Sequence, residues 1–390
     1  MKNLISISAT LALLTTPVFS GGWEASKLST SYLYQDGNYS EFSILPLEFD
    51  VGAQIQHPLA PKSKISNDQK RLSSALKLDY GKLDIGLSRY QSGFLQFDGQ
   101  SASLEGCNPA DATTLPLCSV VPTGDATWNS TVLLARYEMD ENYSIFGGFN
   151  RYTLSEGSVT TLAAHYKVET TSSSVSVVGG AYERSDIALR VEAIYQPNKR
   201  VDVPTSSSLS ALIPTTPVTN AYYTIPETLT INLQSGIAEG TLLYGTIHQA
   251  NWGDAQIDIP ANSNGINPFT GAADAAVSAV GSSFADRTHY TIGIGRKISE
   301  NLALSLSYGT EDGSGPTNDD PFTFRNGTDT YSVAARYSMD NLTVSAGYTY
   351  TNAGDVKIVH EAAPGVPSGL TANYTDNNVS GFGIRLGFTF

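Results

Sequence analysis

Apolar and polar positions alternate along most of this chain, and the pattern is clearest in residues 381–390. The apolar members of this stretch are Phe382, Ile384, Leu386, Phe388 and Phe390. Glycine, arginine and threonine occupy the positions between them. Because successive side chains of a β-strand point to opposite faces, the stretch predicts a strand with one large apolar face and one small, polar face. A strand of a soluble β-sandwich could carry the same pattern. The rest of the chain therefore has to decide whether the apolar face meets a protein core or lipid.

The same two-residue period recurs from residue 39 onward and predicts about fourteen strands. The predicted strands cover residues 39–56, 71–80, 83–97, 128–139, 143–154, 174–182, 187–203, 222–234, 241–259, 287–298, 301–310, 329–339, 342–359 and, last, the carboxy-terminal stretch. Short connections such as 140–142 alternate with long ones such as 98–125. A transmembrane barrel requires this alternation, because its short turns lie in the periplasm and its long loops outside the cell. A soluble propeller would not enforce it and is the remaining structural alternative.

The predicted fold class is therefore all-β: a transmembrane antiparallel β-barrel of about fourteen strands in the bacterial outer membrane, formed by residues 39–390. The amino terminus agrees with export, since a lysine, an apolar core and small residues before Gly21 predict a signal peptide over residues 1–20. This apolar core is too short for a membrane-spanning helix, which needs about 20 residues. Residues 21–38 lack strand periodicity, and we expect a short plug inside the barrel or a periplasmic tail.

The composition supports a membrane barrel. Hydrophobic residues make up 41% of the chain and charged residues only 15%, and there are 35 glycines and 21 tyrosines. These values fit alternating strands with aromatic girdles better than a soluble α/β enzyme, whose helices carry more Leu, Ala, Lys and Glu.

Candidate chemistry is sparse. The 5 histidines are scattered without the spacing of a zinc site or a Ser–His pair, and no glycine-rich phosphate loop opens a helix. We therefore expect no metal, no cofactor and no enzyme activity, although some outer-membrane barrels are proteases or phospholipases. The formal net charge of −14 disfavours nucleic acid as a partner.

The two cysteines, Cys107 and Cys118, lie in one proline-containing loop. In an oxidising envelope a disulfide that closes this loop is expected, whereas a thiol or metal role is the minor alternative.

Two predicted exterior loops, residues 204–220 and 260–285, are apolar and poor in charge. Exposed apolar surface usually marks a binding groove, whereas a polar-solute porin needs a charged constriction. The alternative is that these apolar residues only pack loop against loop.

Several segments resemble the FadL/TodX family of outer-membrane transporters for long-chain fatty acids and other hydrophobic compounds. Asp36–Ser43 resembles the first strand of that family. Ile225-Pro226-Glu227-Thr228 and Gly245–Trp252 resemble two later strands. The segments ISENLALSLSYG, VSAGYTYTNAG and SGFGIRLGFTF fit its last hairpins.

The resemblance implies a passive route for a hydrophobic cargo. Capture would occur in a groove between residues 155–172 and 204–220, with Leu162, Tyr166, Leu209, Leu212, Ile213 and Val218 as binding residues. Cargo would leave sideways into the bilayer at an inward kink of the third strand, for which Gly86 and Gly93 are the candidates. The segment before the first strand is shorter than the family's hatch, which implies a smaller plug or a more open channel.

The expected partners are outer-membrane lipid, the hydrophobic cargo and the barrel-assembly machinery, which would bind the carboxy-terminal Phe390. A monomer is favoured. The alternative functions are a polar-solute porin, or an adhesin or phage receptor that uses the exterior loops.

Overall fold

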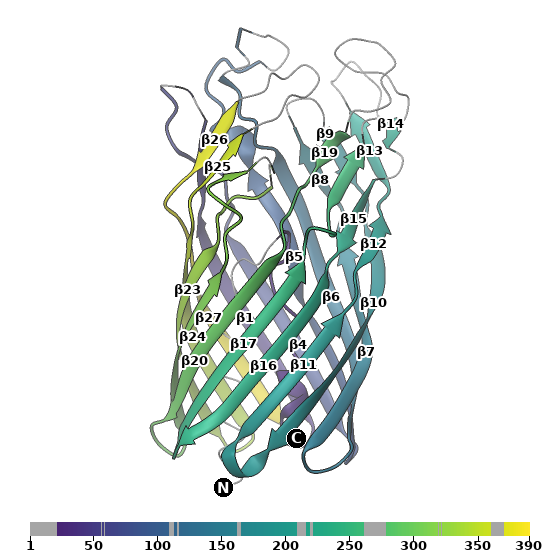
Figure 1. Cartoon of the computed structure of the whole chain (residues 1–390), viewed down its shortest axis with the longest axis vertical. Helices are drawn as coiled ribbons and strands as arrows, with labels where there is room; N and C mark the ends of the chain where they lie inside the picture. The colour runs from purple at the N-terminus through teal and green to yellow at the C-terminus, as the bar shows by residue number, and fades with distance from the viewer. Residues whose placement is uncertain are drawn as a thin grey trace.

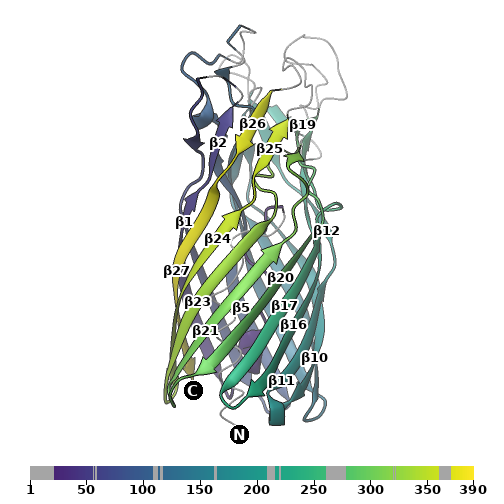
Figure 2. The same ribbon diagram turned by 60° about the vertical axis from the view of Figure 1, so that its left-hand side comes forward.

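Fourteen antiparallel strands close into a barrel in the computed structural model (Figure 1). The wall strands are β1 (Tyr39–Asp50), β4 (Gln69–Asp79), β5 (Leu83–Asp98), β6 (Thr123–Glu138), β7 (Tyr143–Leu154), β10 (Thr171–Arg184), β11 (Leu189–Gln196), β16 (Glu227–Ala238), β17 (Thr241–Asn251), β20 (Arg287–Lys297), β21 (Leu302–Glu311), β23 (Thr328–Met339), β24 (Leu342–Ala353) and β27 (Asn377–Thr389). The first and last of these lie side by side and close the cylinder, with Tyr39 opposite Thr389 (Figure 2). The predicted fold class and strand number are confirmed.

The structure describes residues 22–55, 57, 59–108, 113–114, 117–161, 165–208, 216–218, 221–260, 278–318, 320, 322–359 and 370–390. The predicted signal peptide lies outside these residues. Within them, no helix has both the length and the hydrophobicity to cross a membrane.

Several predicted strands are divided into a wall strand and a short strand at the loop end of the barrel. Proline accounts for two of the breaks, because it cannot donate a hydrogen bond to a sheet ladder. Pro226 separates β15 (Tyr222–Ile225) from β16, and Pro197 ends β11 before β12 (Lys199–Asp202).

The other short strands lie at the same end of the barrel (Figure 1). They are β2 (Gly52–Ile55), β3 (Ser63–Lys64), β8 (Gly157–Thr160), β9 (His165–Val168), β13 (Thr205–Ser208), β14 (Thr216–Val218), β18 (Ile257–Pro260), β19 (Ser278–Gly281), β22 (Thr317–Asn318), β25 (Val356–Val359) and β26 (Thr371–Tyr374). Three 3-10 turns complete the described elements: η3 (Ser31–Tyr34), η4 (Gly99–Ala102) and η6 (Ser185–Ile187).

The two faces of the wall differ in chemistry as the alternation predicts. On β27, Phe382 and Leu386 are 54% and 46% exposed on the outside, whereas Arg385 between them is 4% exposed and points inward. Other strands behave alike, with Leu306 60% exposed and the neighbouring Ser305 buried. Large apolar side chains in such numbers on an outer surface are stable in hydrocarbon, and closure of the barrel pairs its first strand with its last.

The connections at the other end are short. Gly81 has φ of +82° in the turn between β4 and β5, a conformation that glycine adopts without a steric penalty. The carboxy terminus lies at this end (Figure 1), as expected for the periplasmic side of an outer-membrane barrel.

Candidate functional site

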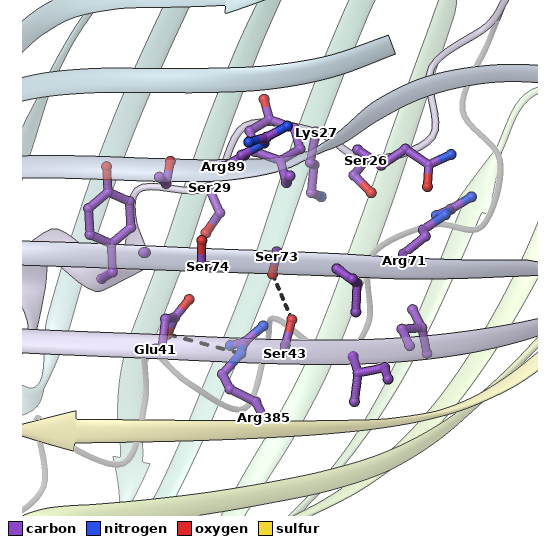
Figure 3. A pocket seen from close by; sticks show the side chains of 18 residues that line it. Ser26, Lys27, Ser29, Glu41, Ser43, Arg71, Ser73, Ser74, Arg89 and Arg385 are labelled. Carbon is purple, nitrogen blue, oxygen red and sulfur yellow. Dashed lines mark hydrogen bonds and ion pairs between the residues drawn. The ribbon is translucent and has the colours of Figure 1, made fainter. Parts of the chain in front are cut away.

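β4 and β5 are paired next to the turn that joins them and separate toward the loop end of the barrel. Their ladder ends where Ser73 faces Tyr90, although β4 continues up to Gln69 and β5 up to Asp98. Over these lengths β4 stays paired with β1, and β5 stays paired with β6. The two edges, residues 69–72 and 91–96, therefore face each other without backbone pairing, and we call this opening the lateral gap. Figure 3 shows the ribbon that carries Arg89 bending away from the one that carries Ser73 and Arg71.

A β-bulge on β5 accounts for the bend. Gln91 faces Asn129 and Gly93 faces Trp128, so Ser92 is an extra residue with no counterpart on β6. An extra residue bends and twists its strand locally. Here it directs the upper part of β5 away from β4.

The lateral gap is closed again at the loop end. Ser66 and Phe97 form an isolated bridge, and the amide of Asp98 donates to the carbonyl of Ile65 at 2.7 Å. Backbone pairing therefore bounds the lateral gap at both ends, and the side chain of Gln69 spans it by donating to Gln96 and accepting from Gln91.

The chain before β1 pairs with the free edge of β5 from inside the barrel. The amide of Ala25 donates to the carbonyl of Ser92 at 2.8 Å, and the amide of Phe94 donates to the carbonyl of Trp23 at 2.9 Å. Arg71 donates a further hydrogen bond to the carbonyl of Ala25. Residues 22–35, which we call the lumenal segment, thus partly replace β4 as the partner of β5.

Gly93 permits this close approach. A Cβ atom at this position would overlap the ring and the carbonyl of Trp23. Gly86 lies lower on β5, where it is still paired with Lys77, and a Cβ there would overlap Leu33 and Tyr32. The two predicted glycines are therefore contact points for the lumenal segment, one at the lateral gap and one below it.

Trp23 anchors the lumenal segment in an aromatic cluster. Its indole stacks on Trp128 with ring centroids 4.7 Å apart. Tyr152, Tyr223 and Trp252 contact it edge-on at 5.4 to 6.1 Å. Burial of so much aromatic surface contributes strongly to docking of the segment.

Polar contacts hold the lumenal segment to opposite sides of the wall. Tyr34 and Thr30 each donate to a carboxylate oxygen of Glu192 at 2.7 Å. Lys77 donates to the carbonyl of Gln35 at 2.6 Å, and the carboxylate of Glu24 lies 3.2 Å from Nε2 of His248. Since these partners belong to β4, β11 and β17, the segment crosses the lumen.

Charged side chains fill the lumen around η3. The guanidinium groups of Arg136 and Arg190 lie 4.4 Å and 4.1 Å from the centroid of the Tyr34 ring. Arg136 also forms ion pairs with Asp84 at 2.9 Å and with Glu183 at 2.8 Å. Cation–π contacts and ion pairs of this kind are strong where water is excluded, so Tyr34 is tightly held.

An apolar cavity of about 50 Å³ lies on the loop side of Glu24. Its apolar lining is Phe49, Val51, Ile65, Phe94, Leu95, Phe97, Phe322, Phe324 and Ala353. Phe97 contacts Phe324 with centroids 4.5 Å apart, and Glu24 and Arg325 are the charged residues at its edge. We call it the phenylalanine pocket. Apolar walls with few polar groups are typical of sites for hydrophobic ligands.

A second cavity, of about 80 Å³, lies beside the lateral gap. It contacts the lumenal residues Lys27, Tyr32 and Arg71, and also Leu72 and Arg89 on the outer face. We call it the wall cavity (Figure 3). Within it, Ser43 and Ser73 share a hydrogen bond of 2.6 Å, and Glu41 lies 4.0 Å from Arg385.

The two loops predicted to capture cargo lie next to each other. β9 pairs with β13, and β13 pairs with β14, so the described strands of these two loops share one sheet. Tyr166 on β9 is 3% exposed and packs into the apolar core above the lumen, and Val218 is on β14 opposite Thr205. Leu162, Leu209, Leu212 and Ile213 lie outside the described residues. Cys107 and Cys118 form a disulfide with Cα atoms 5.0 Å apart.

Sequence reasoning missed the phenylalanine pocket and the lumenal contacts. Phe49 has the parity of inward positions on β1, which was the available signal. Phe97 has the parity of the exposed Leu83 and Leu87, and only the bulge at Ser92 brings it to the inner face. Phe322 and Phe324 come from the segment before β23, and no local pattern links them to the strands that they contact.

No protein-family model and no curated protein sequence matches this chain. Solved structures do. A FadL homologue from Pseudomonas aeruginosa matches with a TM-score of 0.72 and 10% identity over 92% of each chain. The toluene transporters TodX from P. putida and TbuX from Ralstonia pickettii match over 99% of each chain, with TM-scores of 0.61 and 0.58 and identities of 12% and 9%. This chain therefore has the fold of the FadL and TodX transporters, as the resemblance in its sequence predicts.

Proposed function

We propose that this protein is a passive outer-membrane transporter that takes up hydrophobic small molecules and releases them sideways into the bilayer through the lateral gap. The observation that carries the proposal is the end of the β4–β5 ladder at Ser73 and Tyr90, with a bulge at Ser92. Two similar structures are toluene transporters, which supports a hydrophobic cargo for this chain.

Lateral release suits such a cargo for a physical reason. A hydrophobic molecule that enters the bilayer directly avoids the cost of exposing apolar surface to the aqueous periplasm. The charged groups around Tyr34 favour this route, because they occupy the lumen between the phenylalanine pocket and the periplasmic turns. Diffusion down a gradient suffices, and no energy source is required.

In this proposal the exterior loops capture the cargo and the phenylalanine pocket receives it. The groove residues remain Leu162, Leu209, Leu212, Ile213 and Val218, whereas the buried Tyr166 supports the sheet beneath them. Gly93 and the bulge form the gate, and Gly86 leaves room for the side chains of η3.

The lumenal segment acts as a plug that must shift during transport. The wall cavity and the phenylalanine pocket, of about 80 Å³ and 50 Å³, are too small for a long-chain molecule to pass while the segment is docked. Movement of residues 23–25 away from β5 breaks two backbone hydrogen bonds and joins the two cavities to the lateral gap.

Uptake by whole cells tests the function. Cells that lack their own transporter and express this protein should accumulate radiolabelled hexadecanoate or toluene, while the purified protein shows little ion conductance in planar bilayers. High conductance without uptake would identify a polar-solute porin. Neither signal, together with phage or cell binding through the loops, would identify a receptor or adhesin.

A further inference from the structure

The outer face of the wall carries a row of polar side chains beside the lateral gap. Arg89 on β5 pairs with Thr131 on β6, which in turn pairs with Arg151 on β7. Arg151 pairs with Ser174 on β10, and all four side chains are exposed. Lys199 on β12 reaches the same row, because its ammonium group donates to the carbonyl of Ser174 at 3.0 Å. We call these five residues the polar row.

The polar row begins where the apolar outer surface of β5 is short. On β5 three outward apolar residues precede Arg89, whereas on β23, elsewhere in the wall, four precede Asp329. They are Leu83, Ile85 and Leu87 on β5, and Tyr337, Ala335, Val333 and Tyr331 on β23. An arginine that faces hydrocarbon is costly unless its guanidinium reaches a polar group. Arg89 therefore favours a lipid headgroup close to this part of the wall.

The cations of the polar row have no carboxylate partners. Among the described residues, the guanidinium of Arg89 forms no hydrogen bond or ion pair, and that of Arg151 donates to the hydroxyl of Ser172 at 2.7 Å. Lys199 donates to a backbone carbonyl. Neutral oxygen acceptors leave the positive charge uncompensated, so these side chains attract an anion.

Other strands carry negative charge at the corresponding place. Glu227 follows Leu229 among the outward residues of β16, and Asp329 follows Tyr331 on β23. On β1, Glu48 follows Pro46. The charge at the loop end of the apolar surface is therefore positive from β5 to β12 and negative on these three strands. An anion that approaches the outer face is attracted to one sector of the barrel.

The place and spacing of the polar row specify the ligand. The row lies outside the barrel at the loop-side border of its apolar surface, where lipid headgroups are within reach. Neighbouring strands are about 4.8 Å apart, so the Cα atoms of Arg89 and Arg151 are about 10 Å apart. Cations at this spacing fit two phosphate groups better than one. The hydroxyls of Thr131 and Ser174 suit the sugar hydroxyls of a glycolipid.

We propose that the polar row binds the headgroup of a diphosphorylated glycolipid in the outer leaflet. Arg89 holds one phosphate, and Arg151 with Lys199 holds the other, since guanidinium groups bind phosphate oxygens in pairs. The acyl chains lie on the apolar residues below the row, such as Leu133, which is 52% exposed. The bound lipid thus borders the lateral gap, and this inference does not depend on which cargo the protein carries.

The test measures binding of lipid A to the purified barrel in detergent by native mass spectrometry. Lipid A has two phosphates on a disaccharide, its dephosphorylated form keeps the sugars and acyl chains, and phosphatidylglycerol has one phosphate. We expect the wild type to bind lipid A roughly tenfold or more tightly than either of the other two lipids, the loss of a charged hydrogen bond. This comparison requires no variant.

Variants then place the site on the wall. The double variant Arg89→Gln with Arg151→Gln should bind lipid A roughly tenfold or more weakly than the wild type. Replacing both arginines by lysine keeps the charge and should weaken binding less. Lys82→Gln removes a cation from the exposed β4–β5 turn at the other end of the barrel and should bind as the wild type does. Folding of each variant is checked by heat-modifiable migration.

Equal affinity of the wild type for lipid A and its dephosphorylated form would overturn the inference, because phosphate would then not be recognised. Equal affinity for phosphatidylglycerol would overturn the assignment of a headgroup with two phosphates. Wild-type affinity in a folded Arg89→Gln, Arg151→Gln double variant would show that the lipid binds away from the polar row.

Discussion

The carbonyl of Trp23 accepts a hydrogen bond from the amide of Phe94 at 2.9 Å, so a residue from before the barrel completes the edge of a wall strand. This bond forms where β5 has lost its pairing with β4. The lumenal segment and the edge of the lateral gap are therefore joined by hydrogen bonds, and displacement of residues 23–25 would leave that edge of β5 without a partner.

Replacement of Trp23 by alanine should loosen the lumenal segment. The substitution removes an indole that packs against Trp128, Tyr223 and Trp252, at a cost of about 3–5 kcal/mol for a buried aromatic side chain. Hydrogen exchange of residues 22–35 should become much faster while exchange in the wall strands does not change. Tyr80→Ala, an exposed aromatic on the β4–β5 turn, is the control and should leave exchange of the segment unaltered.

Tyr34→Ala should open the periplasmic half of the lumen to ions. The tyrosine ring lies between the guanidinium groups of Arg136 and Arg190, and a desolvated cation–π contact contributes roughly 2 kcal/mol. Conductance in planar bilayers should rise clearly above that of the wild type. Tyr34→Phe keeps the ring and loses only the hydrogen bond to Glu192, so it should leak far less. Equal conductance of the wild type and Tyr34→Ala would show that this contact does not seal the lumen.

Uptake of a neutral hydrophobic cargo such as toluene should fall as the pH rises from 7 to 9. Burial lowers the pKa of Lys27 to about 8, against the opposing attraction of Glu24. Deprotonation above this pH strengthens docking of the lumenal segment, because a pKa below that of the free lysine means that docking favours the neutral form.

Lys27→Met is the control for this pH dependence. It removes the titration of Lys27 and leaves the other titratable groups of the chain in place. The remaining uptake should be nearly flat between pH 7 and 9. A decline as steep as that of the wild type would assign the pH dependence to other groups.

Loss of the disulfide should affect the exterior loop and spare the barrel. Cys107 and Cys118 are 11 residues apart, and closure of a loop of this size stabilises it by about 2–4 kcal/mol. Replacing both cysteines by serine should make the loop after η4 sensitive to protease, with heat-modifiable migration of the barrel unchanged. A barrel that no longer assembles would contradict this prediction.

The wall could be predicted from sequence because its determinants are local. Period-two alternation on strands such as β27 fixes which side chains meet lipid, and short turns such as Asp140–Asn142 fix which strands pair. Prediction was less accurate where proline interrupts a strand, as at Pro226, because the apolar pattern continues through the break.

The site was harder to predict because it depends on contacts between distant residues. Gly93 was identified as a candidate for a bend, and it lies at the bulge. The pairing of Trp23 with Phe94, or of Glu24 with His248, leaves no periodic signal in either segment. Neither the lumenal position of the residues before β1 nor the phenylalanine pocket could therefore be predicted from local sequence.

Deletion of Ser92 is the most direct test of lateral release. The deletion removes the bulge and keeps the inward and outward parity of β5 against β6, so β5 can continue its ladder with β4 and close the lateral gap. Ser92→Ala retains the bulge and serves as the matched control. With both variants folded in the outer membrane, we expect uptake of hydrophobic cargo to be lost in the deletion and kept in Ser92→Ala. A folded deletion variant that transports as fast as the wild type would contradict release through the wall.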